Sequence, residues 1–107
     1  MKEATPFTIR TYVDQSGKRP FSDWLHSFKN DKTRSIIRMR VNRLKFGNFG
    51  DCKYLQKGVY ELRIHYGKGF RVYFAKKRNI IIILLCGGDK HTQINDIKKA
   101  QEFWELY

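Results

Sequence analysis

The sequence contains few cysteines and no long apolar run. Only two cysteines occur in 107 residues, and Cys52 and Cys86 have neither the spacing of a zinc knuckle nor that of a CxxC redox pair. This excludes a disulfide-stapled scaffold and favours two reduced thiols in apolar surroundings. The longest apolar run, Ile80 to Cys86, is far too short to cross a bilayer and predicts a buried strand instead.

Signatures of the common hydrolases and cofactor enzymes are also missing. The sequence has no Gly-x-Ser-x-Gly motif, no phosphate-binding loop and no dinucleotide fingerprint. Its histidines, His26, His65 and His91, are scattered without zinc spacing, so we expect neither a metal nor a small-molecule cofactor. The first six residues, Met-Lys-Glu-Ala-Thr-Pro, contain no apolar signal core, which predicts a cytoplasmic protein without a membrane partner.

Cations, in contrast, are abundant. The chain carries 22 Lys and Arg residues against 10 Asp and Glu residues, and the resulting formal charge is +12. A field of this sign attracts a polyanionic partner such as nucleic acid. Eight Phe, six Tyr and two Trp residues supply apolar surface for a core, and a chain of this length forms one domain. We therefore expect a single basic domain spanning residues 1–107.

Hydrophobic periodicity predicts four strands and three helices. They fall at 7–13 (strand), 20–28 and 32–46 (helices), 59–65, 70–75 and 80–85 (strands), and in a last helix that begins at Thr92 or Asn95. Because the last three strands are joined by short turns, they should be antiparallel neighbours. The predicted fold is α+β, with a small and mainly antiparallel sheet, the order β-α-α-β-β-β-α, and helices packed on one side.

The second predicted helix has one apolar and one cationic face. Ile37, Val41 and Leu44 recur at helical spacing, and no acidic residue lies between Lys32 and Asp51. The cationic positions are Lys32, Arg34, Arg38, Arg40, Arg43 and Lys45. Such a face fits contacts to RNA phosphates, and it fits ordinary solvation equally well.

Strand alternation groups further charged residues on one face of the sheet. In the strand that contains Glu61, Arg63 and His65 the alternate positions are apolar, so these three side chains should face outward. On the next strand Arg71 and Tyr73 can join the same face.

This predicted face has the parts for cutting RNA without a metal. Cleavage needs a base for the attacking 2′-hydroxyl, cations for the phosphorane oxygens, and an acid for the leaving 5′-oxygen. Arginines suit the phosphate because the guanidinium offers paired donors, and Tyr73 can stack on a base. Lys90 and His91 follow the last strand at the edge of this face. The same pattern also fits a solvated sheet face, where Glu61 and an arginine form an ion pair worth roughly 0.2 to 1 kcal/mol.

Five segments of the sequence resemble one protein family. The segments are Arg19-Pro-Phe-Ser-Asp-Trp-Leu25, Gly47-Asn-Phe-Gly-Asp51, Gly58-Val-Tyr-Glu-Leu-Arg-Ile64, Gly69-Phe-Arg-Val-Tyr-Phe74, and Gly87-Gly-Asp-Lys-His-Thr-Gln93 followed by Asp96-Ile97. In them the chain is similar to the HigB-like, phage Gp49-like addiction-module killer proteins of the RelE/ParE toxin superfamily. The resemblance covers nearly the whole chain, and the order of elements in that superfamily agrees with the order predicted from periodicity.

The resemblance implies a type II toxin that pairs with a cognate helix-turn-helix antitoxin. For the better-known relatives it implies an endoribonuclease, or mRNA interferase, that inhibits translation by cutting mRNA in the ribosomal A site. By the RelE pattern of basic strand residues, the implied catalytic positions are Arg63, Arg71 and Lys90, and Lys53 is a further RNA-binding position.

The chain departs from the RelE pattern at the base and in the last helix. Glu61 replaces a lysine-like position, and the last helix offers Asn95 and Asp96 in place of a tyrosine. We hypothesise that Glu61 acts as the base or orients Arg63, and that His91 or Lys90 is the acid.

Two other functions remain open at the level of sequence. ParE-like members of the same superfamily inhibit DNA gyrase by binding and need no nuclease site. A non-enzymatic nucleic-acid-binding protein that uses the basic helix is the second alternative, and it predicts salt-dependent binding to duplexes without cleavage.

Overall fold

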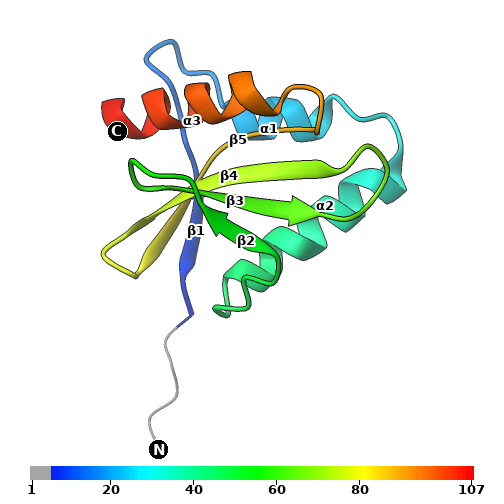
Figure 1. Ribbon diagram of the computed structural model, residues 1–107, viewed down its shortest axis with the longest axis horizontal. Helices are drawn as coiled ribbons and strands as arrows, with labels where there is room; N and C mark the ends of the chain where they lie inside the picture. Colours follow the sequence, from blue (N-terminus) through cyan, green and yellow to red (C-terminus); the bar gives the residue numbers. More distant parts are fainter. Residues whose placement is uncertain (1–5) are drawn as a thin grey trace, which may run out of the picture.

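A five-stranded mixed sheet lies at the centre of the protein (Figure 1). The computed structural model describes residues 6–107. The elements are β1 (Thr8–Thr11), α1 (Pro20–His26), α2 (Asp31–Leu44), β2 (Cys52–Tyr54), β3 (Val59–Ile64), β4 (Phe70–Lys77), β5 (Ile81–Gly88) and α3 (Gln93–Leu106). In space the strands follow the order β1-β5-β4-β3-β2. β1 runs parallel to β5, and the other three pairings are antiparallel.

Local sequence signals account for the ends of several elements. Pro20 occupies the first turn of α1, where its missing N–H is not needed. The Asn30 side chain caps α2 by accepting hydrogen bonds from the backbone N–H of Lys32 at 2.8 Å and of Thr33 at 3.3 Å. Arg78 and Asn79 both have left-handed backbone angles, φ 54° and 53°, and form the tight turn between β4 and β5.

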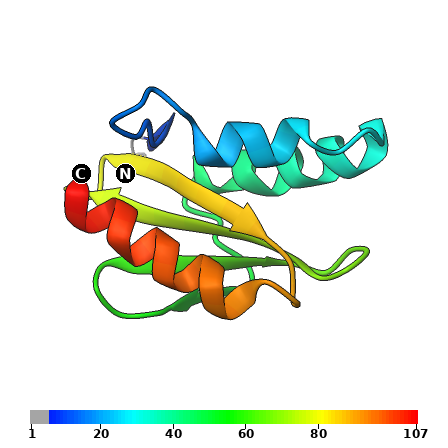
Figure 2. The same cartoon turned by 90° about the horizontal axis from the view of Figure 1, so that it is seen from above.

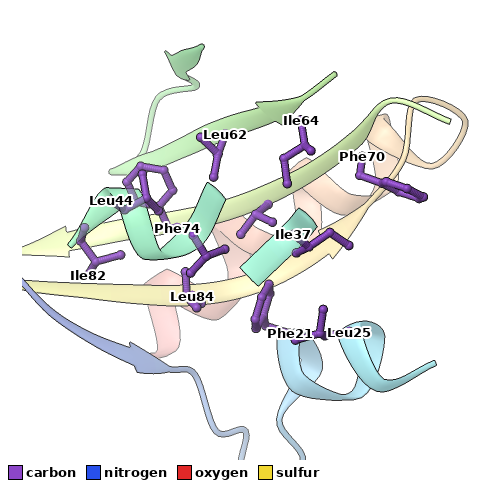
Figure 3. Packing of buried hydrophobic residues seen from close by; sticks show 12 residues of the cluster. Phe21, Leu25, Ile37, Leu44, Leu62, Ile64, Phe70, Phe74, Ile82 and Leu84 are labelled. Carbon is purple, nitrogen blue, oxygen red and sulfur yellow. The ribbon is translucent and has the colours of Figure 1, made fainter. Parts of the chain in front are cut away.

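One face of the sheet packs against α1 and α2. The helices contribute residues at helical spacing, and the strands contribute the alternate positions of β3, β4 and β5. Figure 3 shows how these side chains meet between the layers, and those labelled are Phe21, Leu25, Ile37, Leu44, Leu62, Ile64, Phe70, Phe74, Ile82 and Leu84. This face is a continuous apolar core.

The opposite face of the sheet packs against α3, as Figure 2 shows. Ala100 of α3 is fully buried with Val59, Ile83 and Leu85 of the strands. The prediction that all helices pack on one side is therefore wrong. Its physical reason lies in β5, which is buried on both faces and needs a covering layer on each.

The predicted α+β class and the mainly antiparallel sheet are confirmed. The predicted order lacked β2, since its three residues are too short to show alternation. Within the described part of the chain, no helix combines the length and the apolar character that crossing a membrane requires.

A bulge in β5 sets the direction of the residues that follow it. Tyr73 of β4 pairs with Cys86, but Phe74 pairs with Leu84, so Leu85 is an extra residue on β5. After the bulge Gly87 lies against Trp24 of α1, and the next residue, Gly88, lies against the start of α3. The end of β5 can thus approach helices on both faces because it carries no side chains there.

Candidate functional site

A buried carboxylate forms the centre of the candidate site. Glu61 lies in the middle of β3 and has no exposed surface. Its Oε1 accepts a hydrogen bond from Arg63 Nε at 2.9 Å, and its Oε2 accepts one from Tyr73 Oη at 3.1 Å and one from Gln93 Nε2 at 2.9 Å. Arg71 Nε lies 3.6 Å from the same Oε2. Both carboxylate oxygens are therefore engaged by groups from β3, β4 and α3.

The electrostatics of this cluster keep Glu61 charged. Burial by itself raises the pKa of Glu61, but the hydrogen bonds from Arg63, Gln93 and Tyr73 outweigh it, and the pKa lies below its usual value. Burial, and then the Glu61 carboxylate, raise the pKa of Tyr73 well above that of an ordinary phenol. Tyr73 is consequently a neutral hydrogen-bond donor at any physiological pH.

Two arginines lie side by side next to the Glu61 carboxylate. Arg63 and Arg71 are directly paired across β3 and β4. The Arg63 side chain is 35% exposed, and the Arg71 side chain is 13% exposed. Arg71 Nη1 donates to the Gly69 carbonyl at 2.7 Å. Among residues 6–107 no acceptor bonds the two terminal nitrogens of Arg63, so this half-exposed guanidinium is held at Nε while its outer edge stays available for an anion.

The turn between β5 and α3 borders the arginine pair. Asp89 Oδ1 holds this turn by accepting hydrogen bonds from the backbone N–H of His91 at 2.8 Å and of Thr92 at 3.2 Å. Lys90 lies beside Gly69, which is the residue whose carbonyl binds Arg71. The side chains of Lys90 and His91 are exposed. The turn therefore adds a lysine and a histidine to the rim of the site.

A second buried carboxylate supports the start of α3. Asp96 packs against Gly88, where a Cβ would overlap its carboxylate, and it accepts a hydrogen bond from the Thr92 hydroxyl. Burial raises the pKa of Asp96, although the Thr92 hydrogen bond and Lys99 act in the opposite direction. This contact fixes α3 directly over the end of β5, and so it places Gln93 within reach of Glu61.

The His65 imidazole and the Asp51 carboxylate form a pair that adjoins Arg63. His65 Nε2 lies 2.5 Å from Asp51 Oδ2, and the backbone N–H of Arg63 donates to the Asp51 carbonyl at 2.9 Å. Both side chains are substantially exposed. A carboxylate that fixes one imidazole nitrogen leaves the other for proton transfer, which is the arrangement found in many acid–base catalysts.

The structure brings together the predicted residues on the strands and in the last turn. Glu61, Arg63, Arg71 and Lys90 lie near one end of the sheet on the α3 face. Lys53 is opposite Glu61 in the pairing of β2 with β3, and its side chain is exposed.

The cationic residues of α2 lie elsewhere, because α2 covers the opposite face of the sheet. Two of them are engaged by the protein itself. Arg34 bonds to Asp31 and to the Phe28 carbonyl, while Arg40 donates to the Phe49 carbonyl at 3.4 Å, and burial lowers its pKa. The positions predicted for RNA binding on α2 and at its C-terminal end are thus separated by the sheet from the arginine pair; they are Arg34, Arg38, Arg40, Arg43 and Lys45.

The predicted outward orientation is wrong for two residues of the cluster. Glu61 and Tyr73 have no exposed surface, because the start of α3 covers this part of the sheet face. A ring that is fully buried has no free face on which an RNA base could stack. Tyr73 instead binds Glu61 through its hydroxyl.

Two contributions to the site escaped the sequence prediction. Gln93 reaches Glu61 from the first residue of α3, and Asp51 binds His65 from the loop before β2. The close approach of helices to the end of β5 could have been predicted from Gly87 and Gly88, since adjacent glycines at a strand end indicate that other elements pack closely there. Within residues 6–107, no three His, Cys, Asp or Glu side chains are grouped as they would need to be to hold a metal ion.

The five-stranded mixed sheet with three helices is consistent with a RelE-like fold. Residues 23–104 match the family model described as phage-derived protein Gp49-like (DUF891). The chain belongs to this family, which is associated with addiction-module toxins. An uncharacterised protein of Haemophilus influenzae is 49% identical to the chain over 81 residues, which cover 76% of this chain and 82% of that protein. Family membership indicates the toxin of a toxin–antitoxin pair, with an antitoxin as its partner.

Proposed function

We propose that this protein is a HigB-like, metal-independent endoribonuclease that acts in the cytoplasm and inhibits translation by cutting mRNA on the ribosome. The observation that supports the proposal most directly is the arginine pair beside buried Glu61, to which Arg63 is hydrogen-bonded and Arg71 lies at ion-pair distance. A fixed pair of guanidinium groups beside an exposed lysine is suited to a phosphate whose negative charge increases during the reaction.

In this proposal Arg63 and Arg71 stabilise the phosphorane. The 2′-oxygen forms a bond to phosphorus, the bond from phosphorus to the 5′-oxygen breaks, and the two arginines donate to the non-bridging oxygens. Glu61 is a positioning residue, because both of its oxygens already accept hydrogen bonds and its pKa is lowered. It fixes the Nε edge of Arg63 so that the opposite edge faces the substrate.

Proton transfer then falls to exposed groups around the arginine pair. His65, oriented by Asp51, is the base that accepts the proton of the 2′-hydroxyl. His91 or Lys90, in the turn before α3, donates a proton to the leaving 5′-oxygen. These assignments give every proton a donor and an acceptor from the chain itself, and the products are a cyclic phosphate and a free 5′-hydroxyl.

The test is cleavage of a defined mRNA in a reconstituted translation reaction, with the sites mapped by primer extension. We expect wild-type protein to cut within codons, and Arg63→Ala and Arg71→Ala each to lower the cleavage rate by about 100-fold or more. Arg43→Ala is the matched control, because Arg43 is exposed on α2 across the sheet and should have no effect. Thermal unfolding verifies that each variant is folded.

Other outcomes would support the alternative functions. Intact mRNA together with loss of DNA supercoiling by gyrase would contradict the nuclease and support a ParE-like inhibitor. Intact mRNA together with salt-dependent duplex binding that Arg38→Ala and Arg43→Ala weaken would support a non-enzymatic binder on α2.

A further inference from the structure

An aromatic groove lies at the β2 edge of the sheet, away from the arginine pair. Phe49 and Tyr60 belong to its α2 side, and Trp104 of α3 borders it from the other face. We define it by Phe49, Tyr54, Tyr60, Lys76, Arg78 and Trp104, which line two adjoining hollows of about 330 and 240 Å³. Tyr54, Tyr60 and Lys76 are shared by both hollows. The groove therefore continues from the loop before β2 to the turn between β4 and β5.

The two tyrosines of the groove differ in exposure, since Tyr60 is half-buried against the core whereas Tyr54 lies at the surface. Tyr54 is 46% exposed, and its ring centroid lies 5.1 Å from that of Tyr60. Tyr60 in turn stacks on buried Phe74, with 5.3 Å between the ring centroids. The apolar core thus holds Tyr60 rigidly, and Tyr60 supports Tyr54 at the surface. Rings fixed in this way lose little conformational entropy when a planar ligand stacks on their exposed sides.

The charges in the groove are all of one sign. Lys76 Nζ lies 4.8 Å from the centroid of the Tyr60 ring and 5.3 Å from that of Phe49, and Arg78 is exposed at the turn. No acidic residue lines either hollow in the described part of the chain. Aromatic faces next to unopposed cations match a ligand that combines planar rings with phosphates, which is the chemistry of single-stranded nucleic acid.

The position of the groove connects it to the arginine pair. Tyr60 pairs with Tyr54, and the next residues along these strands, Glu61 and Lys53, pair with each other. Successive side chains point to opposite faces, so exposed Lys53 lies on the α3 side of the edge strand and Tyr54 on the α2 side. From Tyr60 to Arg63 the separation along β3 is about 10 Å. A single strand that crosses the β2 edge would thus pass Lys53 between the two surfaces.

We infer that the aromatic groove binds unpaired bases of the RNA that flanks the cleaved phosphate, by stacking on Tyr54 and Tyr60 with Lys76 beside the backbone. The inference rests on the proposed RNA substrate but not on its cleavage. The aromatic groove would then be a second binding surface, which holds bases next to the cleaved phosphate. The exposed aromatic side chains at the β2 edge would contact the RNA substrate.

The experiment measures binding separately from cleavage. A short fluorescent single-stranded RNA with 2′-O-methyl groups throughout has no attacking hydroxyl, and its affinity is followed by fluorescence anisotropy. We expect Tyr54→Leu to weaken binding by about 5- to 150-fold, the range that loss of one stacked base produces. Tyr54→Phe keeps the ring but loses the hydroxyl that accepts the Gly58 N–H at 3.1 Å, and it should bind like wild type.

Two further variants serve as matched controls. Phe46 is 66% exposed but lies outside the groove, so Phe46→Leu should leave the affinity unchanged. Lys77 neighbours Lys76 but lies over the Tyr107 ring, so Lys77→Gln should weaken binding less than Lys76→Gln. Thermal unfolding shows whether Tyr54→Leu is folded, and Tyr60→Leu provides a second variant at the same surface.

Several results would overturn the inference. Wild-type affinity in both Tyr54→Leu and Tyr60→Leu would show that the rings bind no base. Loss of antitoxin binding with intact RNA binding in these variants would assign the groove to the protein partner instead. These results leave the nuclease proposal standing if Arg63→Ala still lowers the cleavage rate by about 100-fold or more. A wild-type protein that binds the RNA through Tyr54 but cuts no mRNA refutes only the nuclease proposal.

Discussion

The two faces of the sheet bury different kinds of side chain, because one is wholly apolar and the other includes carboxylates. On the α1–α2 face the strands and helices bury an unbroken apolar core (Figure 3). On the α3 face the apolar cluster around Ala100 gives way to Glu61 and Asp96, which are both buried and both ionisable. Burial of an apolar side chain stabilises the fold, whereas burial of a charge costs free energy unless partners restore its hydrogen bonds.

The contrast indicates what each face is for. Replacing a buried ionic cluster by well-packed apolar residues is often neutral or stabilising, so such a cluster is weak evidence for a stabilising role. The Glu61 cluster nevertheless engages Arg63, Tyr73 and Gln93, which come from β3, β4 and α3. We conclude that the α1–α2 face contributes most of the stability, and that the cluster on the α3 face fixes the geometry of the arginines.

The largest effect on stability is expected from the apolar face. Ile37 has no exposed surface and lies in the apolar core between α2 and the sheet. Ile37→Ala should lower the free energy of unfolding by about 2 to 5 kcal/mol, through lost burial and the cavity left behind. Urea unfolding measures the loss, and cleavage per folded molecule should not change. A variant that stays folded but loses cleavage would show that the two faces are coupled.

Removing the charge of Glu61 tests the opposite face. Glu61→Gln keeps the shape of the side chain but weakens hydrogen bonds to a charged group, which should cost about 1.5 to 3 kcal/mol of stability near neutral pH. We expect cleavage to fall steeply while RNA binding stays nearly intact, because the arginines remain but lose their alignment. The pH–rate profile should keep its shape if Glu61 is a positioning residue. Loss of the acid-side limb of the pH–rate profile would show that Glu61 is the base. A wild-type cleavage rate in Glu61→Gln would show that Glu61 has no part in the mechanism.

The same variant has a defined effect on acid stability. The groups that face Glu61 are Arg63, Arg71 and Tyr73, with Gln93 from α3 and Lys53 from β2. The folded pKa of Glu61 is lowered, so its contribution is fully present above its unfolded pKa of about 4.3 and is lost as the pH falls through the folded value. Urea unfolding at a series of pH values should therefore show a smaller acid-side loss in Glu61→Gln. An unchanged slope would contradict the lowered pKa.

Adjacent glycines at the end of β5 allow each face to be disturbed alone. A Cβ on Gly87 would overlap the Trp24 ring, and a Cβ on Gly88 would overlap the Asp96 carboxylate. Each Gly→Ala substitution should cost about 1 to 3 kcal/mol by overpacking. Only Gly88→Ala should also lower cleavage, because it displaces the start of α3 and with it Gln93. Equal cleavage by the two variants, corrected for the folded fraction, would refute a separate role for the α3 face.

The sequence predicted the apolar face better than the charged one, and the reason is physical. The spacing of Ile37, Val41 and Leu44 is a local property that determines which side of α2 is buried. Alternation in β3 likewise separated Leu62 from Glu61, but it could not tell which layer would cover Glu61. That depends on α3 crossing to the other face, and on pairs as distant in sequence as Glu61 and Gln93. Long-range contacts of this kind leave no periodic signal.

The smallest effect is expected at the other buried carboxylate of the α3 face. Burial raises the pKa of Asp96, whereas the hydrogen bonds to Glu61 lower the pKa of that residue. The raised pKa means that the ionised form of Asp96 is disfavoured in the folded protein. The contribution of Asp96 to stability is therefore fully present below its unfolded pKa and is lost as the pH rises through its folded pKa. Asp96→Asn keeps an acceptor for the Thr92 hydroxyl and removes the charge. At neutral pH it should raise the free energy of unfolding by less than about 1 kcal/mol, with cleavage unchanged. A clear loss of stability in urea would mean that the ionised carboxylate is needed at the start of α3, and that the charged face is held together by both of its carboxylates and not by Glu61 alone.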